Sequence, residues 1–222
     1  FGAAVPEVRG QLVRFGGVTL QFPTGSHTTN GRVQVANNPA QPCSLKVADG
    51  ALVVGNQCYV GAISGTSGTL TFSGGGASGD FRTNQPRFGE NAGTGVLAVT
   101  GGASVFMRGV SPMFGWSSGH GTLRVSGVDP ADAYDRSTFR DSLTVGTAVY
   151  FGNQAGDGHA EVLDGALAEF SQVVDFGPYA GSTGSLWVGG AGSVDSARAI
   201  FHSSLGIGHG ENSNPGGTGT VT

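Results

Sequence analysis

The segment Gly68-Thr-Leu-Thr-Phe-Ser-Gly-Gly75 sets out a pattern that recurs along the chain. Further copies are Gly95-Val-Leu-Ala-Val-Thr-Gly-Gly102, Gly121-Thr-Leu-Arg-Val-Ser-Gly127 and Gly184-Ser-Leu-Trp-Val-Gly-Gly190. Each copy reads Gly, a small residue, Leu, any residue, Val or Phe, any residue, Gly. Because side chains alternate along a strand, Leu and Val face one way and the residue between them faces the other. The repeat therefore predicts strands with one apolar face.

The Leu position of the repeat recurs at a nearly constant spacing. With the weaker copies at 43–50, 158–165 and 219–222, the anchors are residues 45, 70, 97, 123, 160, 186 and 221, separated by 25, 27, 26, 37, 26 and 35 residues. An apolar-Gly pair such as Phe88-Gly89 or Phe114-Gly115 places its Gly eight or nine residues before most anchors. A constant half joined to a variable half is typical of stacked coils with insertions in one loop, and only stacking buries the apolar row of each unit.

The sequence thus predicts an all-β fold, a parallel β-helix (β-solenoid) of about six to seven imperfect coils over residues 43–222, open at its C-terminal end. Residues 1–42 fit less well, and we expect an N-terminal cap or a degenerate first coil there. They contain two alternating stretches, 11–15 and 18–22, and then an expected turn-rich loop over 24–31. A β-sandwich is the competing architecture, but it would not need a repeated sequence signature.

Composition agrees with a turn-rich β-protein. Glycine makes up 42 of 222 residues, against a usual level of about 7%. Collagen is excluded because no three-residue Gly period exists, and disorder fits poorly with 38% hydrophobic residues in alternating runs. The 11 basic and 15 acidic residues give a net charge of −4, so we expect no nucleic-acid partner. No apolar run approaches the roughly 20 residues of a membrane helix, so we expect no membrane span.

The phrase Gly-Thr-Leu-x-Val-x-Gly-Gly-Ala, alternating with Val-Gly or Phe-Gly pairs, resembles the passenger repeats of bacterial autotransporters. It is also similar to the repeats of large exported proteins that carry a PEP-CTERM sorting signal. The resemblance covers residues 43–222 and implies a right-handed β-helix and export to the cell surface or beyond, but no particular activity. We expect either a fragment of such a protein or a chain that shares only its repeat, because a translocating barrel, a sorting tail and a signal peptide are missing.

These observations favour an extracellular or cell-surface module with a structural or adhesive role, part of a surface fibre, a matrix or an autotransporter passenger. We expect no enzymatic activity and no cofactor. Since the sequence stops in mid-repeat at Val221-Thr222, the open coil is expected to pair with other copies, head-to-tail or laterally, or with the rest of a longer chain.

The alternative is a carbohydrate-binding or carbohydrate-cleaving β-helix of the phage tailspike or polysaccharide lyase type. Cleavage needs a groove with stacked acids on one face. The outward positions of the repeat form no acidic row, since they are occupied by Thr71, Ala98, Arg124, Glu161 and Trp187. Arg124 and Glu161 are expected to be neighbours, and we identify no catalytic residue.

Three carboxylates gather in the long 37-residue step, where Asp129, Asp132 and Asp135 are expected on a projecting loop. They are weak candidates for calcium ligands or an acid pair, because carboxylates on a loop suit a hard cation. The EF-hand spacing is absent, so a solvated loop is the favoured interpretation and we predict no metal site. His120 and His159 are expected close together, but two imidazoles do not make a metal site without a third ligand.

The chain has two cysteines, Cys43 and Cys58. In an exported protein we expect them to form a disulfide, and two buried thiols are the alternative.

Exposed aromatic side chains can stack on sugar rings or seal a protein contact, and the candidates for a glycan or partner contact are Trp187, Tyr134 and Tyr179. Trp187 takes an outward position, whereas Tyr59, Tyr134 and Tyr179 are expected in loops. Specific function is expected in the long insertions, around residues 128–145 and 192–215, with surface glycans as candidate ligands.

Overall fold

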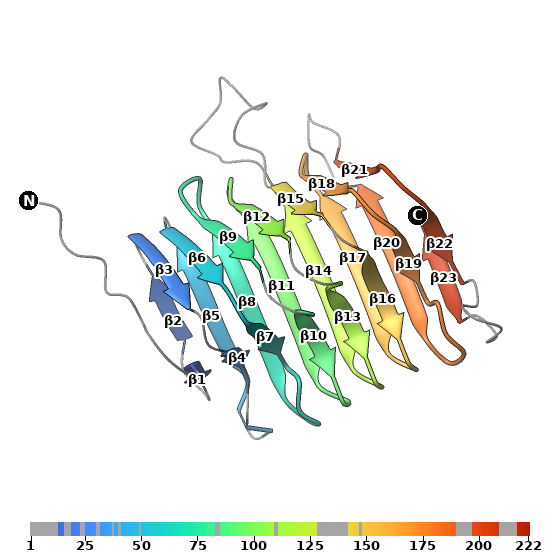
Figure 1. The fold of residues 1–222 in the computed structure, drawn as a ribbon, viewed down its shortest axis with the longest axis horizontal. Helices are drawn as coiled ribbons and strands as arrows, with labels where there is room; N and C mark the ends of the chain where they lie inside the picture. The colour runs from blue at the N-terminus through green and yellow to red at the C-terminus, as the bar shows by residue number, and fades with distance from the viewer. Residues whose placement is uncertain are drawn as a thin grey trace, which may run out of the picture.

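Three parallel sheets of eight, eight and seven strands form the computed structural model, and no helix occurs among the residues it describes. These residues are 13–15, 19–22, 25–29, 32–36, 38–39, 41–48, 50–82, 85–108, 111–127, 142–146, 148–189, 197–208 and 217–222. The chain passes from one sheet to the next, so that each full coil adds one strand to every sheet (Figure 1). The predicted all-β parallel solenoid is confirmed, with a coil number slightly different from six to seven.

The strands of sheet A are β1 (Val13–Phe15), β4 (Arg32–Val35), β7 (Gln57–Val60), β10 (Arg87–Glu90), β13 (Met113–Trp116), β16 (Val149–Asn153), β19 (Val174–Phe176) and β22 (Leu205–Ile207). Those of sheet B are β2 (Thr19–Phe22), β5 (Cys43–Ala48), β8 (Ser67–Ser73), β11 (Thr94–Thr100), β14 (His120–Ser126), β17 (Asp157–Leu163), β20 (Thr183–Gly189) and β23 (Thr218–Val221). Those of sheet C are β3 (Gly25–Thr29), β6 (Gly50–Val54), β9 (Ser78–Phe81), β12 (Ser104–Met107), β15 (Ser142–Val145), β18 (Leu167–Phe170) and β21 (Arg198–Phe201).

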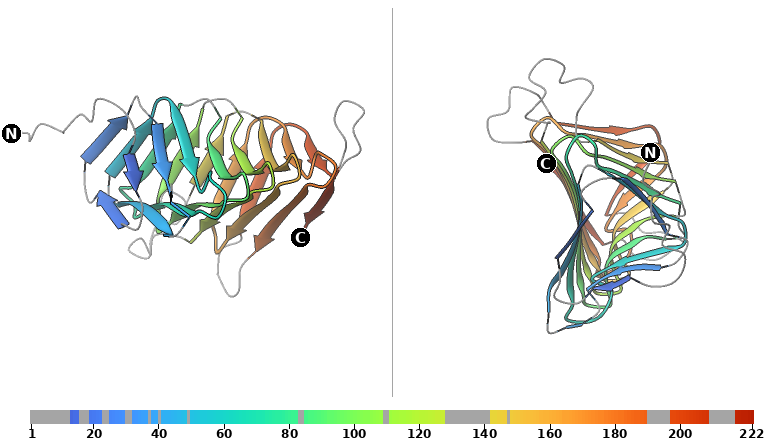
Figure 2. Two further views of the ribbon diagram at one scale, coloured as in Figure 1. Left: turned by 90° about the horizontal axis from the view of Figure 1, so that it is seen from below. Right: turned by 90° about the vertical axis from the view of Figure 1, so that its left-hand side faces the viewer.

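The anchor residues of the repeat stand directly opposite one another in sheet B. The register pairs residues 45, 70, 97, 123, 160, 186 and 221 in succession, in the order the repeat predicts. The anchors from Leu45 to Leu186 are buried. Figure 2 shows the interior that the three sheets enclose. Stacking therefore converts a row of single leucines into one continuous core.

A column of phenylalanines from sheet A lies against this row. Phe88, Phe114, Phe151 and Phe176 are fully buried, and neighbouring rings stack with centroids 4.7, 5.0 and 4.6 Å apart. Their spacing equals the separation of hydrogen-bonded strands, so each ring lies flat on the ring of the next coil. The phenylalanine of the apolar-Gly pair thus serves as core.

The glycine that follows each of these phenylalanines is required by the corner between sheets A and B. Gly89 and Gly115 have φ of 70° and 72°. A Cβ on Gly89 would lie 1.9 Å from the backbone oxygen of His120, and one on Gly115 would lie 2.0 Å from that of Asp157. Only a residue without a side chain fits, because the next coil passes directly over it.

The corner itself is a tight turn that recurs in successive coils. The backbone N–H of Gly93, Gly119 and Gly156 donates to the carbonyl three residues earlier, at 2.9, 3.0 and 3.1 Å. The two central residues have positive φ in each case, as in Asn91 (50°) and Ala92 (59°). This is the type I′ geometry, and it fixes the residue that opens each turn at the outer edge of sheet A.

Residues 1–42 contribute four strands, β1 to β4. β1 pairs in parallel with β4 of the same segment, while β2 and β3 pair in parallel with β5 and β6. The loop expected over 24–31 therefore contains a strand, and the described part of this segment continues the ladder. The boundary at residue 42 stays a prediction. Tyr59 also lies in a strand, β7, rather than in a loop, because it alternates with the buried Cys58 and Val60.

The structure has Cys43 and Cys58 as buried thiols rather than as the expected disulfide. Their positions explain this: Cys43 begins a strand of sheet B, whereas Cys58 lies opposite Val33 in sheet A, so each fills a place in the apolar core. Burial raises the pKa of the Cys58 thiol to about 12. Among the described residues there is also no helix that could cross a membrane.

Candidate functional site

The outer face of sheet B carries rows of polar side chains. The register places Lys46, Thr71, Ala98, Arg124, Glu161 and Trp187 in one such row. Arg124 donates to Glu161 at 2.5 Å, so the expected neighbours form an ion pair across two coils. Trp187 is 53% exposed at the predicted outward position. A surface pair of this kind contributes less than about 1 kcal/mol, so the row contains no strong site by itself.

A second group on this face brings the two histidines to one carboxylate. Asp157 Oδ2 lies 3.4 Å from Nδ1 of His120 and 3.0 Å from Nε2 of His159. Thr183 donates to the other carboxylate oxygen, and Nδ1 of His159 lies 2.5 Å from Oγ of Ser185. Burial acts to raise the pKa of Asp157, but the hydrogen bond from Thr183 and the charge and hydrogen bond of His159, with the bond from His120, lower it overall.

Ser185, His159 and Asp157 form a hydrogen-bonded series of hydroxyl, imidazole and carboxylate, as in a catalytic triad. The surroundings of this series do not support nucleophilic catalysis. The group stands on the outer face of sheet B, and the backbone N–H groups of Asp157 and Thr183 donate to the carbonyls of Gly119 and Gly156 in the preceding coil. These N–H groups therefore cannot serve as an oxyanion hole. No set of three or more His, Cys, Asp or Glu side chains in the described ranges is placed to hold a metal ion. We interpret the group as a polar clamp between coils.

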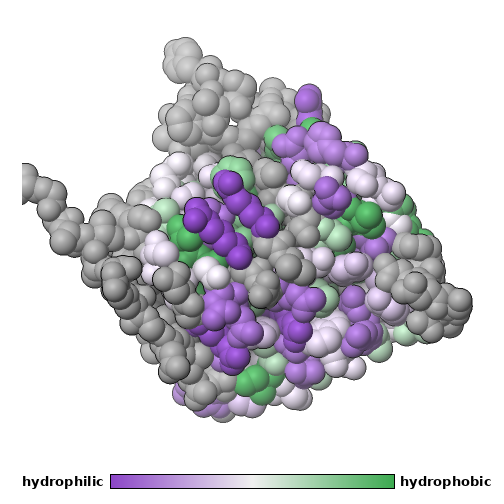
Figure 3. Space-filling view, viewed as in Figure 1, coloured by the Kyte–Doolittle hydropathy of each residue, from purple (hydrophilic) through white to green (hydrophobic). Residues whose placement is uncertain are grey.

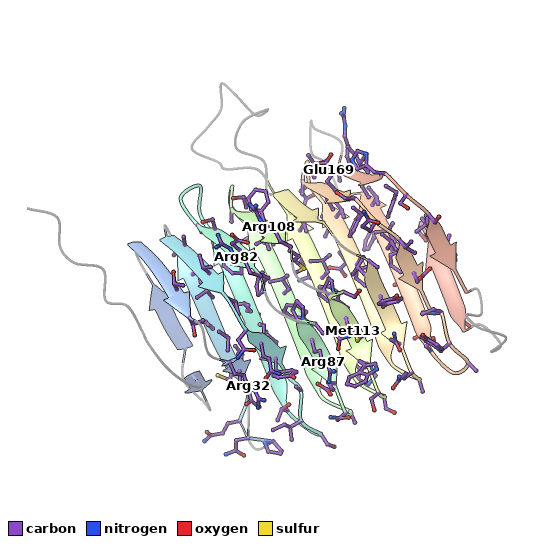
Figure 4. All side chains as sticks on the ribbon, in the orientation of Figure 1. Arg32, Arg82, Arg87, Arg108, Met113 and Glu169 are labelled. Atoms are coloured by element: carbon purple, nitrogen blue, oxygen red, sulfur yellow. The ribbon has the colours of Figure 1, made fainter. Side chains whose placement is uncertain are left out.

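The strongest candidate site lies on the outer side of sheet A. Here one row runs through Tyr59, Arg87, Met113 and Tyr150, and a second row runs through Glu90, Trp116 and Asn153. The first row precedes the buried phenylalanines and the second opens the tight turns described above. Figure 4 shows Arg32, Arg87 and Met113 along this side of the ribbon, on β4, β10 and β13.

A depression of about 320 Å³ opens between these rows. Three aromatic residues, Trp116, Tyr150 and Tyr179, line it together with Met113 and four uncharged polar residues, one of them Asn153. Tyr179, a sequence candidate, reaches it from the turn before β20. A neighbouring depression of about 310 Å³ is lined by Tyr59, Arg32, Gln34, Glu90, Asn91, Ala62 and Ile63.

Arg87 separates the two depressions and is held from several sides. Its guanidinium lies 3.7 Å from the centroid of the Trp116 ring and 5.7 Å from that of Tyr59. Nη1 donates to Glu90 at 2.6 Å, and Nη2 donates to Gln85 at 3.2 Å. The ion pair neutralises the arginine, while the stacking contact fixes the plane of the indole.

Three buried polar atoms at this place have no hydrogen-bond partner within the protein: Nε of Arg87, Nε1 of Trp116 and Oδ1 of Asn153. Among the described residues five such atoms occur, so most of them are gathered here. Each buried polar atom left without a partner costs on the order of 1–3 kcal/mol, and native proteins contain few of them. Their concentration marks a place where a ligand or ordered water completes the bonding.

Several sequence candidates fall elsewhere. Asp129, Asp132, Asp135 and Tyr134 lie outside the described residues, as do most of the two long insertions, so the calcium and acid-pair hypotheses stay untested. Trp187 does not line the depression, because it lies on the outer face of sheet B rather than on sheet A. On the face in Figure 3 hydrophobic atoms form separate patches among hydrophilic ones.

The sequence analysis missed Arg87, Trp116 and Asn153. A usable signal exists, because each stands directly beside an apolar-Gly pair: Arg87 comes directly before one, and Trp116 and Asn153 each come directly after one. Reading both neighbours of that pair as one outward row would have brought these residues together.

No protein-family model, no curated protein and no solved structure matches this chain.

Proposed function

We propose that the chain is a structural and adhesive β-solenoid module that works outside the cell or on its surface, as part of a fibre, matrix or autotransporter passenger. The observation that carries the proposal is the last coil, where the apolar ladder continues but is uncovered. Leu205, Ile207 and Val221 are 38%, 44% and 44% exposed. Their partners in the preceding coil, Val174, Phe176 and Leu186, are at most 2% exposed.

A further coil stacked on this end would cover these side chains in the way that every inner coil is covered. β19 pairs in parallel with β16 on one side and with β22 on the other, so the end presents the kind of surface that the solenoid already uses for its own assembly. Covering each side chain contributes on the order of 1 kcal/mol, and the strand edge adds backbone hydrogen bonds. The occupants we propose are a coil from a second copy, which gives head-to-tail fibres, or the next coil of a longer chain.

The test is self-association of the purified chain, measured by size-exclusion chromatography with light scattering and by electron microscopy. We expect mass to rise with concentration in the micromolar range and short filaments to form. An Ile207→Lys, Val221→Lys double variant should stay monomeric, because it places two charges on the stacking surface. Ile63→Lys is the matched control, since Ile63 is 37% exposed but lies at a corner within the solenoid. A monomeric wild type at high micromolar concentration, without filaments, contradicts head-to-tail association between copies.

Carbohydrate cleavage receives less support from the registers. Carboxylates on the outer faces of the described strands lie opposite residues that are not acidic. Glu161 lies opposite Arg124 and Trp187, and Glu169 lies opposite Thr144 and Ile200. Asp157 lies opposite His120 and Thr183, and Asp80 lies opposite Val53 and Phe106. A pair of carboxylates on one face is the requirement for that chemistry. Absence of enzymatic activity stays a prediction, and incubation with bacterial polysaccharides followed by reducing-end analysis tests it.

A further inference from the structure

We propose that the outer side of sheet A binds a linear, uncharged oligosaccharide, with the depression at Trp116 and Asn153 as its principal subsite. The inference names the ligand class of the adhesive module proposed above, but it rests on a different part of the molecule. It is carried by four properties of that surface: its unpartnered polar atoms, its aromatic rings, its charge and its length.

The unpartnered atoms supply both hydrogen-bonding roles that a sugar hydroxyl needs. Nε1 of Trp116 is a donor and Oδ1 of Asn153 is an acceptor, and both residues line the same depression. They lie opposite each other in the register of β13 and β16. Asn153 is only 4% exposed, so its amide is built into the site rather than left on a solvated surface. A hydroxyl donates and accepts at once and can satisfy the two atoms together.

The aromatic rings supply the second element of sugar recognition. A pyranose ring has a face of C–H groups that packs on an aromatic face, while its hydroxyls point outward to polar partners. Trp116, Tyr150 and Tyr179 line the depression, and each combines an apolar ring with a polar group. Because Arg87 covers one face of Trp116 and is itself tied to Glu90, the indole is held in place before a ligand arrives. Such pre-organisation reduces the entropy lost on binding.

Charge selects a neutral ligand. All eight residues that line the depression are uncharged, and the nearest ion pair, Arg87 with Glu90 at 2.6 Å, is internally balanced. Asp175 lies opposite Tyr150 in the same row, is 1% exposed and does not line the depression. The principal subsite therefore holds no cation that could bind a carboxylate or sulfate group, and Arg32 lines only the neighbouring depression. Uronic acids and sulfated sugars lack a partner here.

The length of the surface selects a chain over a single sugar. Tyr59 of the neighbouring depression and Tyr150 of the principal one belong to the same row, three strand steps apart, which corresponds to about 14 Å. The row follows the long axis of the solenoid. An extended oligosaccharide laid along it meets an aromatic ring at both ends and the Arg87–Trp116 stack between them.

The test uses Trp116 as its own reporter. The chain has two tryptophans, so Trp187→Phe leaves Trp116 as the single emitter, and this change lies on sheet B, away from the site. We titrate this variant with cellohexaose, maltohexaose, xylohexaose and chitohexaose, and with glucose and hexagalacturonic acid for comparison. We expect a saturable change in emission with at least one neutral hexasaccharide, tighter binding than for glucose, and no response to hexagalacturonic acid.

Two substitutions connect the response to the site. Asn153→Ala removes the acceptor, and we expect binding to weaken about tenfold, the effect of losing one buried hydrogen bond. Tyr150→Ala removes an aromatic ring that lines the depression, and we also expect it to weaken binding. Because the Tyr150 side chain is only half-buried, this variant replaces Asn153→Ala if circular dichroism shows that Asn153→Ala does not fold. Calorimetry with the unmodified chain shows whether Trp187→Phe itself leaves affinity unchanged, as we expect.

The proposal is overturned if none of the four neutral hexasaccharides binds up to millimolar concentration, or if only hexagalacturonic acid binds. Binding that neither Asn153→Ala nor Tyr150→Ala weakens also overturns it. Light scattering on these variants separates this result from the fibre proposal, because the end-coil residues Ile207 and Val221 are not part of the sugar surface. Loss of sugar binding with intact self-association therefore speaks to the site alone.

Discussion

Replacing the corner glycine Gly115 by alanine should lower the free energy of unfolding far more than the same change at Gly181. Both glycines have a left-handed backbone, with φ of 72° and 75°. For either one, alanine pays a conformational penalty of about 1–2 kcal/mol. They differ in their surroundings, because a Cβ on Gly181 meets nothing nearer than the Ala155 Cβ at 3.7 Å, whereas a Cβ on Gly115 would lie 2.0 Å from the backbone oxygen of Asp157.

The magnitude follows from the displacement that the contact forces. To bring the Cβ of residue 115 to 3.0 Å from the carbonyl oxygen, the coils must separate by about 1 Å at this corner. The N–H of Asp157 donates to Gly119 at 2.9 Å, so the same movement takes that bond beyond hydrogen-bonding distance. It also loosens Phe114 from Phe151, whose rings are 5.0 Å apart. We therefore expect Gly115→Ala to lower the free energy of unfolding by about 4 kcal/mol or more.

Urea unfolding followed by circular dichroism and tryptophan fluorescence measures both variants. Gly181→Ala should fold and lose about 1–2 kcal/mol, and Gly115→Ala should unfold at much lower urea or fail to fold. If the two variants differ by less than about 1 kcal/mol, the coils are not held in the close contact described here, and the explanation of the apolar-Gly pair is wrong.

Three further predictions concern the core, the polar clamp and the thiols. Phe114→Ala should lower the free energy of unfolding in urea by about 3–5 kcal/mol, because it leaves a cavity in the middle of the stacked rings. Phe106→Ala, at a 37% exposed position, should lower it by about 1 kcal/mol or less. Equal losses for the two variants would contradict the stacked column. Since the folded state lowers the pKa of Asp157, this carboxylate stabilises the fold above its unfolded pKa near pH 4, and the contribution is lost as pH falls further. The urea midpoint of the wild type should therefore exceed that of Asp157→Asn at pH 7 and approach it in acid, and a pH-independent gap would contradict the assignment. Cys58 and Cys43 should resist a thiol reagent at pH 8 in the folded protein and both react in urea; failure to react in urea would reveal a disulfide.

The ladder could be predicted from sequence because a parallel solenoid repeats its requirements. The anchor must be apolar since it faces the interior, and the glycine must lack a side chain since the next coil crosses it. Both requirements return in every coil, so Leu70, Leu97 and Leu123 could be aligned by counting residues, and the structure pairs them in that order.

The candidate site could not be predicted in the same way, because its residues do not repeat. Arg87, Met113 and Tyr150 occupy one row of sheet A with no chemical similarity to one another. Their proximity depends on the register of strands that are 26 and 37 residues apart, and their unpartnered atoms depend on burial by neighbouring coils. Stacking of the core does not restrict which residues occupy the outward positions. These positions therefore show no repeated pattern, and a search for sequence repeats does not find them. The expected disulfide could not be judged from sequence for a related reason. Cys43 lies on sheet B and Cys58 on sheet A, and each thiol is buried in the core.

The uniform corner and ring column also determine how a gene for such a protein can change. Each coil offers its successor the same surface, so deleting residues 95–120 would join Thr94 to Gly121 and set Leu123 on Leu70 in the register that Leu97 has now. Copying the same segment would insert one more coil, and the distance between the two ends of the solenoid would grow by about 4.8 Å. Recombination within the repeat can therefore lengthen or shorten the protein in whole steps, while point mutation at Gly115 or Phe114 is closely restricted.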